Sequence, residues 1–127
     1  MPTKPLIAII DDDEPVRVAL QSLVRSVGLT AQAFASAADF LAAADGPRVA
    51  CLILDVKMPG MTGLALHRHL VASGRPIPTI LITANPDDAA RAEALRDGAL
   101  CYLSKPFTED DLLAWINTAL GRHGGGS

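Results

Sequence analysis

The stretch Leu6-Ile-Ala-Ile-Ile10, followed directly by Asp11-Asp-Asp13, decides the fold of this 127-residue chain. Five consecutive apolar residues predict a strand that is buried on both faces, as in the interior of a parallel sheet. Pro15 comes next, and proline fits the first turn of a helix. Beyond it, apolar residues recur at helical spacing, at Val16, Leu20, Leu23 and Val24.

The same alternation of apolar run and amphipathic stretch continues along the chain. Further strands are expected at 29–34, at 51–54 ending on Asp55, at 79–83 and at 99–104. Helices are expected at 15–27, at 36–44, from Thr62 to Ser73, at 87–97, and after Thr108. Five strands that alternate with five helices predict an α/β fold, in which helices cover both faces of a parallel sheet.

Composition narrows the functional classes. The length fits one domain, and the net charge of −3 gives no basic surface, so we expect no nucleic-acid contact by this domain. No run of 18 apolar residues predicts a membrane span, and Met1–Lys4 is too short and polar to open a signal peptide. Cys51 and Cys101 lie in apolar runs and are expected to be buried and reduced. These features favour a cytoplasmic protein.

Polar residues gather at one end of the expected strands. Asp11 and Asp12 follow the first strand, Asp55 ends the third, Thr83 ends the fourth, and Lys105 follows the fifth. In an open parallel sheet, ligands bind outside the carboxyl ends of the strands. The sequence therefore predicts a functional site at this edge.

The residue types at this edge indicate phosphoryl chemistry. Three carboxylates in one pocket repel one another unless a cation lies among them, and oxygen ligands with room for water and phosphate suit Mg2+. Lys105 adds a cation, and Thr83 adds a hydroxyl donor. An aspartate carboxylate can attack phosphorus and form an acyl phosphate, so Asp55 is the candidate acceptor.

Four runs at this edge resemble the receiver domain of bacterial two-component response regulators, and most closely the nitrogen-fixation and nodulation type. The runs are Ile9–Arg17, Leu54–Gly63, Leu81–Ala84 and Tyr102–Phe107. The resemblance implies a flavodoxin-like (βα)5 doubly wound sheet with strand order 2-1-3-4-5. It implies a receiver domain over residues 1–122. The glycine-rich composition of 123–127 is that of the start of a linker or an expression tail. The resemblance also implies a DNA-binding domain after the receiver.

The same resemblance implies a role for each residue of the metal and acceptor site. Asp55 would accept the phosphoryl group from a phosphohistidine of a sensor histidine kinase. Asp12 would bind Mg2+ directly, Asp11 largely through water, and Lys57 through its backbone carbonyl.

The resemblance implies a switch as well. Thr83 would hydrogen-bond the phosphoryl group, Lys105 would pair with it, and a cis bond would join Lys105 to Pro106. Tyr102 would turn inward when Thr83 moves. Phosphorylation would then promote association, such as homodimer formation, through the fourth helix, fifth strand and fifth helix.

Other interpretations stay open from the sequence. A Mg2+-dependent phosphatase with an aspartyl-phosphate intermediate usually has a second acid two residues after the nucleophile, where this chain has Lys57. A receiver that works alone through protein contacts, or one that is never phosphorylated, are further alternatives. No Gly-x-Gly-x-x-Gly follows the first strand, which excludes a dinucleotide site. His67 and His69 cannot share a metal and are expected at the surface.

Overall fold

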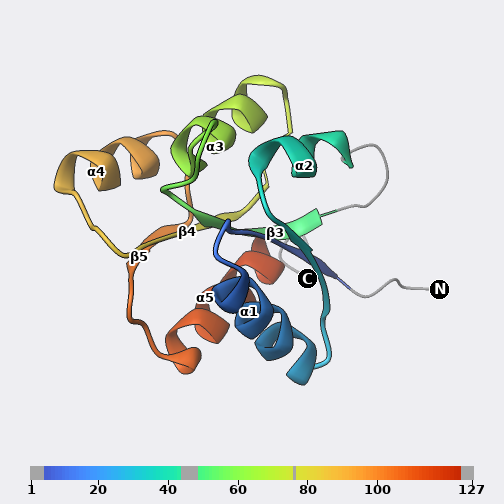
Figure 1. Ribbon diagram of the computed structural model, residues 1–127. Coiled ribbons are helices and arrows are strands. Elements are labelled where there is room, and N and C mark those ends of the chain that lie inside the picture. Colours follow the sequence, from blue (N-terminus) through green and yellow to red (C-terminus); the bar gives the residue numbers. More distant parts are fainter. Residues whose placement is uncertain (1–4, 44–48, 76, 124–127) are drawn as a thin grey trace.

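Five parallel strands form a single sheet in the order β2-β1-β3-β4-β5. The computed structural model describes residues 5–43, 49–75 and 77–123 (Figure 1). The predicted flavodoxin-like architecture is confirmed, because the crossovers place β1 between β2 and β3. The strands are β1 (Leu6–Ile10), β2 (Thr30–Phe34), β3 (Val49–Asp55), β4 (Thr79–Thr83) and β5 (Cys101–Ser104).

Helices cover both faces of the sheet. Figure 1 shows α1 and α5 on one face and α2, α3 and α4 on the other. In the part of the chain that the structure describes, no helix is long and apolar enough to cross a membrane. The helices are α1 (Glu14–Ser26), α2 (Ala37–Ala42), α3 (Gly63–Ala72), α4 (Asp88–Arg96) and α5 (Glu109–His123).

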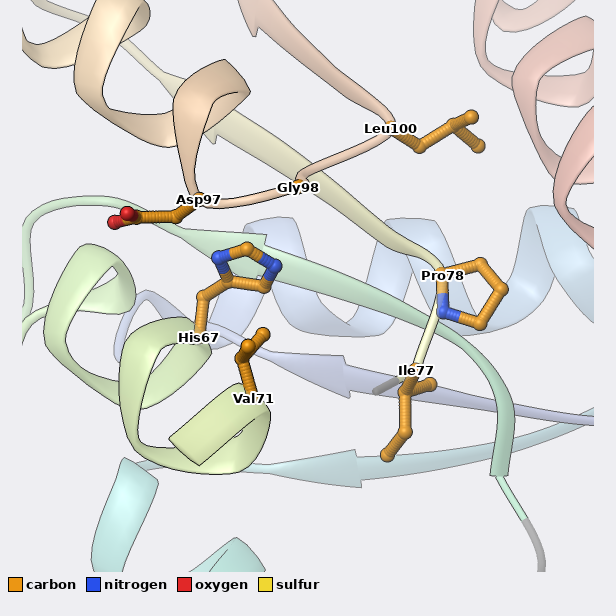
Figure 2. A pocket seen from close by; sticks show the side chains of 7 residues that line it. All are labelled: His67, Val71, Ile77, Pro78, Asp97, Gly98 and Leu100. Atoms are coloured by element: carbon orange, nitrogen blue, oxygen red, sulfur yellow. The ribbon is translucent and has the colours of Figure 1, made fainter. Parts of the chain in front are cut away.

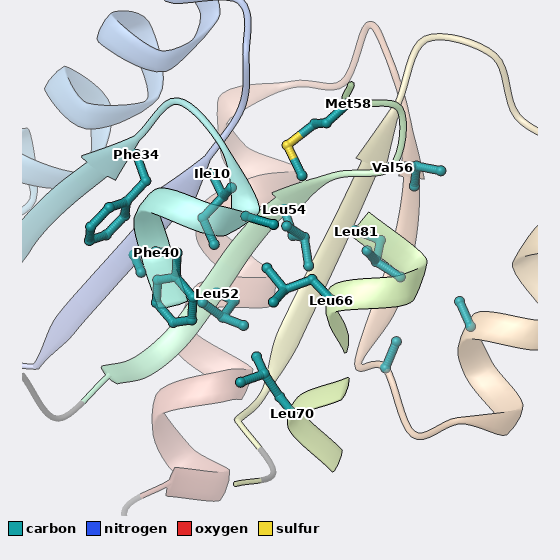
Figure 3. Packing of buried hydrophobic residues seen from close by; sticks show 14 of the residues in the cluster. Ile10, Phe34, Phe40, Leu52, Leu54, Val56, Met58, Leu66, Leu70 and Leu81 are labelled. Carbon is teal, nitrogen blue, oxygen red and sulfur yellow. The ribbon is translucent and has the colours of Figure 1, made fainter. Parts of the chain in front are cut away.

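Two apolar cores lie on the two faces of the sheet. Successive strand residues point to opposite faces, so Ile7 and Ile9 pack toward α1 and α5, whereas Ala8 and Ile10 pack toward α2 and α3. Figure 3 shows the second of these cores. Burial of all four residues explains why the first strand reads as an unbroken apolar run.

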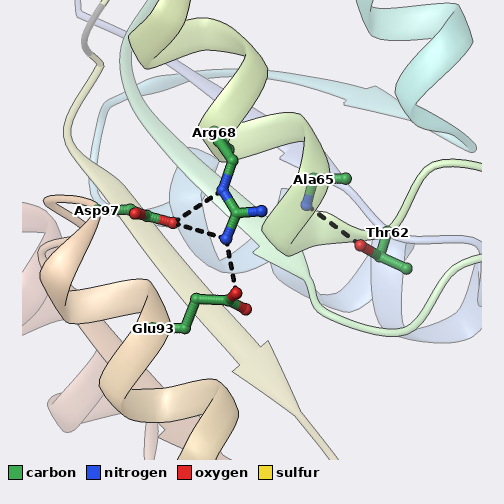
Figure 4. Close-up of polar contacts among 5 residues, drawn as sticks. All are labelled: Thr62, Ala65, Arg68, Glu93 and Asp97. Atoms are coloured by element: carbon green, nitrogen blue, oxygen red, sulfur yellow. Dashed lines mark hydrogen bonds and ion pairs between the residues drawn. The ribbon is translucent and has the colours of Figure 1, made fainter.

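Side-chain caps set where three of the predicted helices begin. The hydroxyl oxygens of Ser36, Thr62 and Thr108 accept backbone N–H bonds three residues ahead, at 3.0, 3.1 and 3.0 Å. Figure 4 draws the Thr62 cap. The N–H groups in the first turn of a helix have no carbonyl partner within the helix, and these hydroxyl oxygens supply the missing acceptors.

Some element ends differ from the sequence-based expectation. β5 begins at Cys101 and not at Ala99, because the Ala99 N–H bonds the Ala94 carbonyl of α4 at 3.0 Å and closes that helix. The expected end of α2 at Ala44 and residues 124–127 of the expected tail lie outside the described residues.

Gly63 lets α3 start directly beside the end of β3. Its N–H donates to the Val56 carbonyl at 2.9 Å. A Cβ at this position would collide with the backbone oxygen of Asp55 and lie 2.9 Å from the Asp55 carbonyl carbon. The α3 N-terminus can approach the end of β3 this closely only because residue 63 has no side chain.

Replacing Gly63 by Ala is expected to lower the free energy of unfolding by roughly 1–3 kcal/mol, the usual cost of overpacking. Gly121→Ala is the control, since that helical glycine has open space and should gain about 0.5–1 kcal/mol. Urea unfolding of both variants measures the difference. A Gly63→Ala variant as stable as Gly121→Ala would contradict the close approach.

Candidate functional site

Three aspartates meet at the carboxyl edge of the sheet. Asp11 and Asp12 follow β1, and Asp55 ends the neighbouring strand β3. One carboxylate oxygen from each residue lies within 4.8 Å of the other two. Asp11 and Asp55 are buried and Asp12 is exposed, so the cluster opens to solvent on the Asp12 side.

Hydrogen bonds hold nearly every polar group of Asp11. Its N–H donates to the Phe34 carbonyl at 3.2 Å, and its Oδ1 accepts from the Asp13 N–H at 2.9 Å. Its carbonyl oxygen accepts from Nη1 of Arg17 at 2.8 Å. Only Oδ2 is fully buried without a hydrogen bond. This oxygen is therefore the one that Asp11 can offer to another group.

Lys105 supplies the positive charge of the site. Its Nζ lies 3.6 Å from Oδ2 of Asp11 and 4.0 Å from Oδ1 of Asp55. Its backbone N–H donates to the Thr83 carbonyl at 2.7 Å, and the peptide bond to Pro106 is cis. Lys105 thus faces both buried carboxylates from the end of β5.

The environment of Asp55 disfavours its charged form. Burial, and then the negative charge of Asp11, raise the Asp55 pKa to about 6. Lys105 and a hydrogen bond from the Lys57 backbone oppose this rise in pKa without cancelling it. A single lysine therefore does not balance the carboxylates.

The donor set fits a hard divalent cation. Three carboxylates within reach of one point, and the buried Oδ2 of Asp11 without a hydrogen bond, are the ligands such an ion requires. Carboxylate oxygens with no nitrogen or sulfur ligand favour hard cations such as Mg2+, Ca2+ and Mn2+ over Zn2+ and Cu2+. Asp11, Asp12 and Asp55 would hold the ion.

Two hydroxyl groups hold the loop between β4 and α4. Oγ1 of Thr83 accepts the Asn85 N–H at 3.1 Å, and the Tyr102 hydroxyl accepts the Asp87 N–H at 3.3 Å. Tyr102 is only 6% exposed. The inward position expected for Tyr102 after phosphorylation is thus the position present in this structure.

His67 corrects a prediction, because it is buried and not at the surface. Helix α3 turns Leu66, His67 and Leu70 toward the core, whereas His69 is exposed. Burial lowers the His67 pKa, and its Nδ1 has no hydrogen-bond partner. Figure 2 shows the ring in a pocket of about 260 Å3, which is lined by His67, Val71, Ile77, Pro78, Asp97, Gly98 and Leu100.

Sequence reasoning missed two arginines. Arg17 ends the run Ile9–Arg17 that carries the resemblance but was given no role, yet it bonds the backbone at the acidic cluster. Arg68 on α3 pairs with Glu93 of α4 at 2.7 Å and with Asp97, the residue after α4, at 3.2 Å. Figure 4 draws both contacts. The Arg68 side chain is 55% exposed, so these pairs add little stability.

Comparison with known proteins decides the family. The response regulator receiver domain family matches residues 7–117. The chain belongs to this family. The crystal structure of FixJ-N is similar to this receiver domain, with a TM-score of 0.85 and 34% identity over 94% of this chain and 95% of that one.

Several relatives of this receiver domain are transcriptional regulators. It is 46% identical to the response regulator protein TmoT of Ectopseudomonas mendocina, over 91% of this chain and 52% of that protein. It is 38% identical to the transcriptional regulatory protein FixJ of Bradyrhizobium diazoefficiens, over 94% of this chain and 58% of that protein. The chain spans about half the length of the curated relatives that it matches first.

Mg2+ binding should depend on Asp12 far more than on Asp13. Asp12 contributes an oxygen to the acidic cluster, whereas the Asp13 side chain makes no capping bond and lies outside the cluster. Loss of a residue that only hydrogen-bonds a metal ligand weakens metal binding by about tenfold or more. Asp12→Ala removes a ligand itself, so it should weaken Mg2+ binding by more than about tenfold. Asp13→Ala keeps the backbone N–H and is the matched control. Equal Mg2+ affinities by calorimetric titration would contradict this assignment.

Proposed function

We propose that this receiver domain takes a phosphoryl group from a phosphohistidine of a sensor histidine kinase onto Asp55, in a reaction that requires Mg2+. The observation that carries the proposal is the position of the Asp55 carboxylate. It lies beside Asp11 and Asp12, with which it could hold a cation, and 4.0 Å from the Lys105 ammonium. Lys57, through its backbone carbonyl, is proposed as the remaining protein ligand of the ion.

In the proposed step, a carboxylate oxygen of Asp55 forms a bond to phosphorus as the bond to the histidine nitrogen breaks. The leaving imidazole takes up a proton, and the product is an acyl phosphate. Bound Mg2+ supplies charge that offsets the phosphoryl oxygens and the carboxylates. Lys105 Nζ pairs with one phosphoryl oxygen, and the Thr83 hydroxyl donates to another.

A phosphatase is the weaker alternative. Lys57 stands where such an enzyme would have its second acid, and its side chain is exposed. We therefore assign a phosphoacceptor in signalling and not a turnover enzyme. Its two free, buried cysteines fit a reducing compartment, and we place the protein in the cytoplasm.

The receiver, over residues 1–122, is proposed to act in a longer regulator, with 123–127 starting a linker. Support comes from relatives that are about twice as long, one of which is named a transcriptional regulatory protein. The proposed output is control of transcription through a following DNA-binding domain. A receiver that acts alone through protein contacts is the alternative.

Asp55 should be the residue that is modified. Incubation with acetyl phosphate and Mg2+ should add one phosphoryl group to the wild type. Asp55 lies near Lys105 and in the acidic cluster, and it keeps some exposed surface, whereas Asp11 is fully buried with one oxygen already hydrogen-bonded. Asp55→Asn should add none by intact-mass spectrometry, and omission of Mg2+ should also abolish the adduct. An adduct on Asp55→Asn would place the acceptor elsewhere.

The hydroxyl contacts of the β4–α4 loop suggest how the signal spreads. If Thr83 Oγ1 turned to the phosphoryl group, the Asn85 N–H would lose its acceptor. The loop would then shift, and the bond between the Asp87 N–H and the Tyr102 hydroxyl would transmit this shift to β5. Because this loop enters α4, we infer that phosphorylation repositions α4 against β5.

The surface over α4, β5 and α5 is the proposed contact face. Leu95 is 43% exposed there. A pocket of about 250 Å3 opens beside it, lined by Arg91, Leu95, Leu100, Cys101, Tyr102, Leu103 and Trp115. A second copy of the chain is the proposed partner on this face, which gives a homodimer on phosphorylation.

Tyr102→Phe should uncouple phosphorylation from association. The variant keeps the ring but loses the oxygen that accepts the Asp87 N–H. It should still bind beryllofluoride, a phosphoryl mimic, while its shift toward dimer in sedimentation falls by severalfold. Such a loss corresponds to a coupling of about 1 kcal/mol. The same dimer fraction in both proteins would exclude the hydroxyl from the switch.

A further inference from the structure

Arg17 holds the peptide group that joins two of the proposed metal ligands. We propose that Arg17 is a positioning residue: its guanidinium fixes the Asp11–Asp12 peptide plane and so aims both carboxylates at one cation. The inference rests on the proposed function of the site. It adds a residue from α1 that does not itself touch the ion.

One hydrogen bond constrains both aspartates. Nη1 of Arg17 donates to the backbone oxygen of Asp11 at 2.8 Å. That oxygen lies in the same planar group as the N and Cα atoms of Asp12. A donor fixed on this oxygen restrains ψ of Asp11 and φ of Asp12, the two torsions that together set how the Asp11 and Asp12 side chains are oriented relative to each other.

The backbone cannot easily supply this donor itself. β1 ends at Ile10, so the Asp11 carbonyl lies beyond the strand. The hydrogen bonds of α1 begin with the Asp13 carbonyl, which accepts the Arg17 N–H at 2.9 Å, so the Asp11 carbonyl also lies before the helix. The Arg17 side chain supplies the donor instead.

The guanidinium is held mainly by the Asp11 carbonyl. Arg17 also lies 3.8 Å from Glu14, but the Glu14 side chain is 79% exposed and such a pair is weak in water. The Arg17 side chain itself is only 18% exposed. The bond to Asp11 is both shorter and better shielded from solvent than the ion pair.

The sign of the effect separates positioning from simple electrostatics. A positive charge close to a cation site repels the cation, so loss of the Arg17 charge alone would tighten Mg2+ binding. Loss of positioning weakens Mg2+ binding, because the two carboxylates no longer converge. The two explanations therefore predict opposite changes in the dissociation constant.

Calorimetric titration with Mg2+ of Arg17→Met, Arg17→Lys and Glu14→Gln tests the proposal. Arg17→Met should weaken binding roughly tenfold, as expected when a group that orients metal ligands is removed. Arg17→Lys keeps the positive charge but loses the planar guanidinium. Its Mg2+ affinity should lie between those of Arg17→Met and the wild type. Glu14→Gln removes the ion pair and keeps the Asp11 bond, so it should stay within about twofold.

A second readout separates positioning from loss of fold. In phosphorylation by acetyl phosphate, Arg17→Met should raise the Mg2+ concentration for half-maximal rate, and saturating Mg2+ should restore the rate. Equal or tighter Mg2+ binding by Arg17→Met would overturn the proposal, and Arg17→Lys decides in the same way if Arg17→Met does not fold. Absence of Mg2+ binding by the wild type would instead contradict the proposed function.

Discussion

Three carboxylates share one pocket at the carboxyl edge of the sheet, and the rest of the site is arranged around that repulsion. Burial and the charge of Asp11 raise the Asp55 pKa to about 6, so the apo protein carries an unfavourable group at its centre. Lys105 offsets part of this cost from 3.6 and 4.0 Å. A divalent cation would supply the positive charge that these three carboxylates and one lysine lack.

The apolar sheet makes this arrangement tolerable. Strands β1, β3 and β4 are buried over almost their whole length, so the edge of the sheet is a rigid support for side chains that repel one another. Gly63 brings α3 against the backbone of Asp55, and Arg17 ties α1 to Asp11. Packing in the two cores thus offsets the unfavourable repulsion among the carboxylates at this edge, as is usual at functional sites.

The residue pattern was sufficient to predict a parallel sheet and the polar residues at its carboxyl edge. Continuous apolar runs such as Leu6–Ile10 have few alternatives to a buried parallel strand, and topology then brings Asp11 and Asp55 together. Strand order came from the family resemblance, since periodicity alone does not set it. Capping residues such as Thr62 marked helix starts because their chemistry is local.

What the sequence could not show depends on long-range packing. His67 looks like a surface residue in a helix with several polar positions, but it lies on the buried face of α3 and is only 3% exposed. Asp97 and Gly98, directly after α4, line the same pocket. The hydrogen bond from Arg17 is to the backbone oxygen of Asp11, an atom that every residue has, so the residue types in the sequence do not predict it. The inward position of Tyr102 depends on an N–H at Asp87, 15 residues away along the chain.

The dependence of stability on pH tests the central claim of carboxylate repulsion most directly. Because the folded pKa of Asp55 lies above its unfolded value of 3.8, its protonated form stabilises the fold below pH 4, and this contribution is lost as the pH rises through about 6. Without metal, the wild type should therefore lose roughly 1–3 kcal/mol relative to Asp55→Asn between pH 4 and 7. Saturating Mg2+ should reverse that loss. Parallel stability curves for the two proteins in chelator would contradict the account.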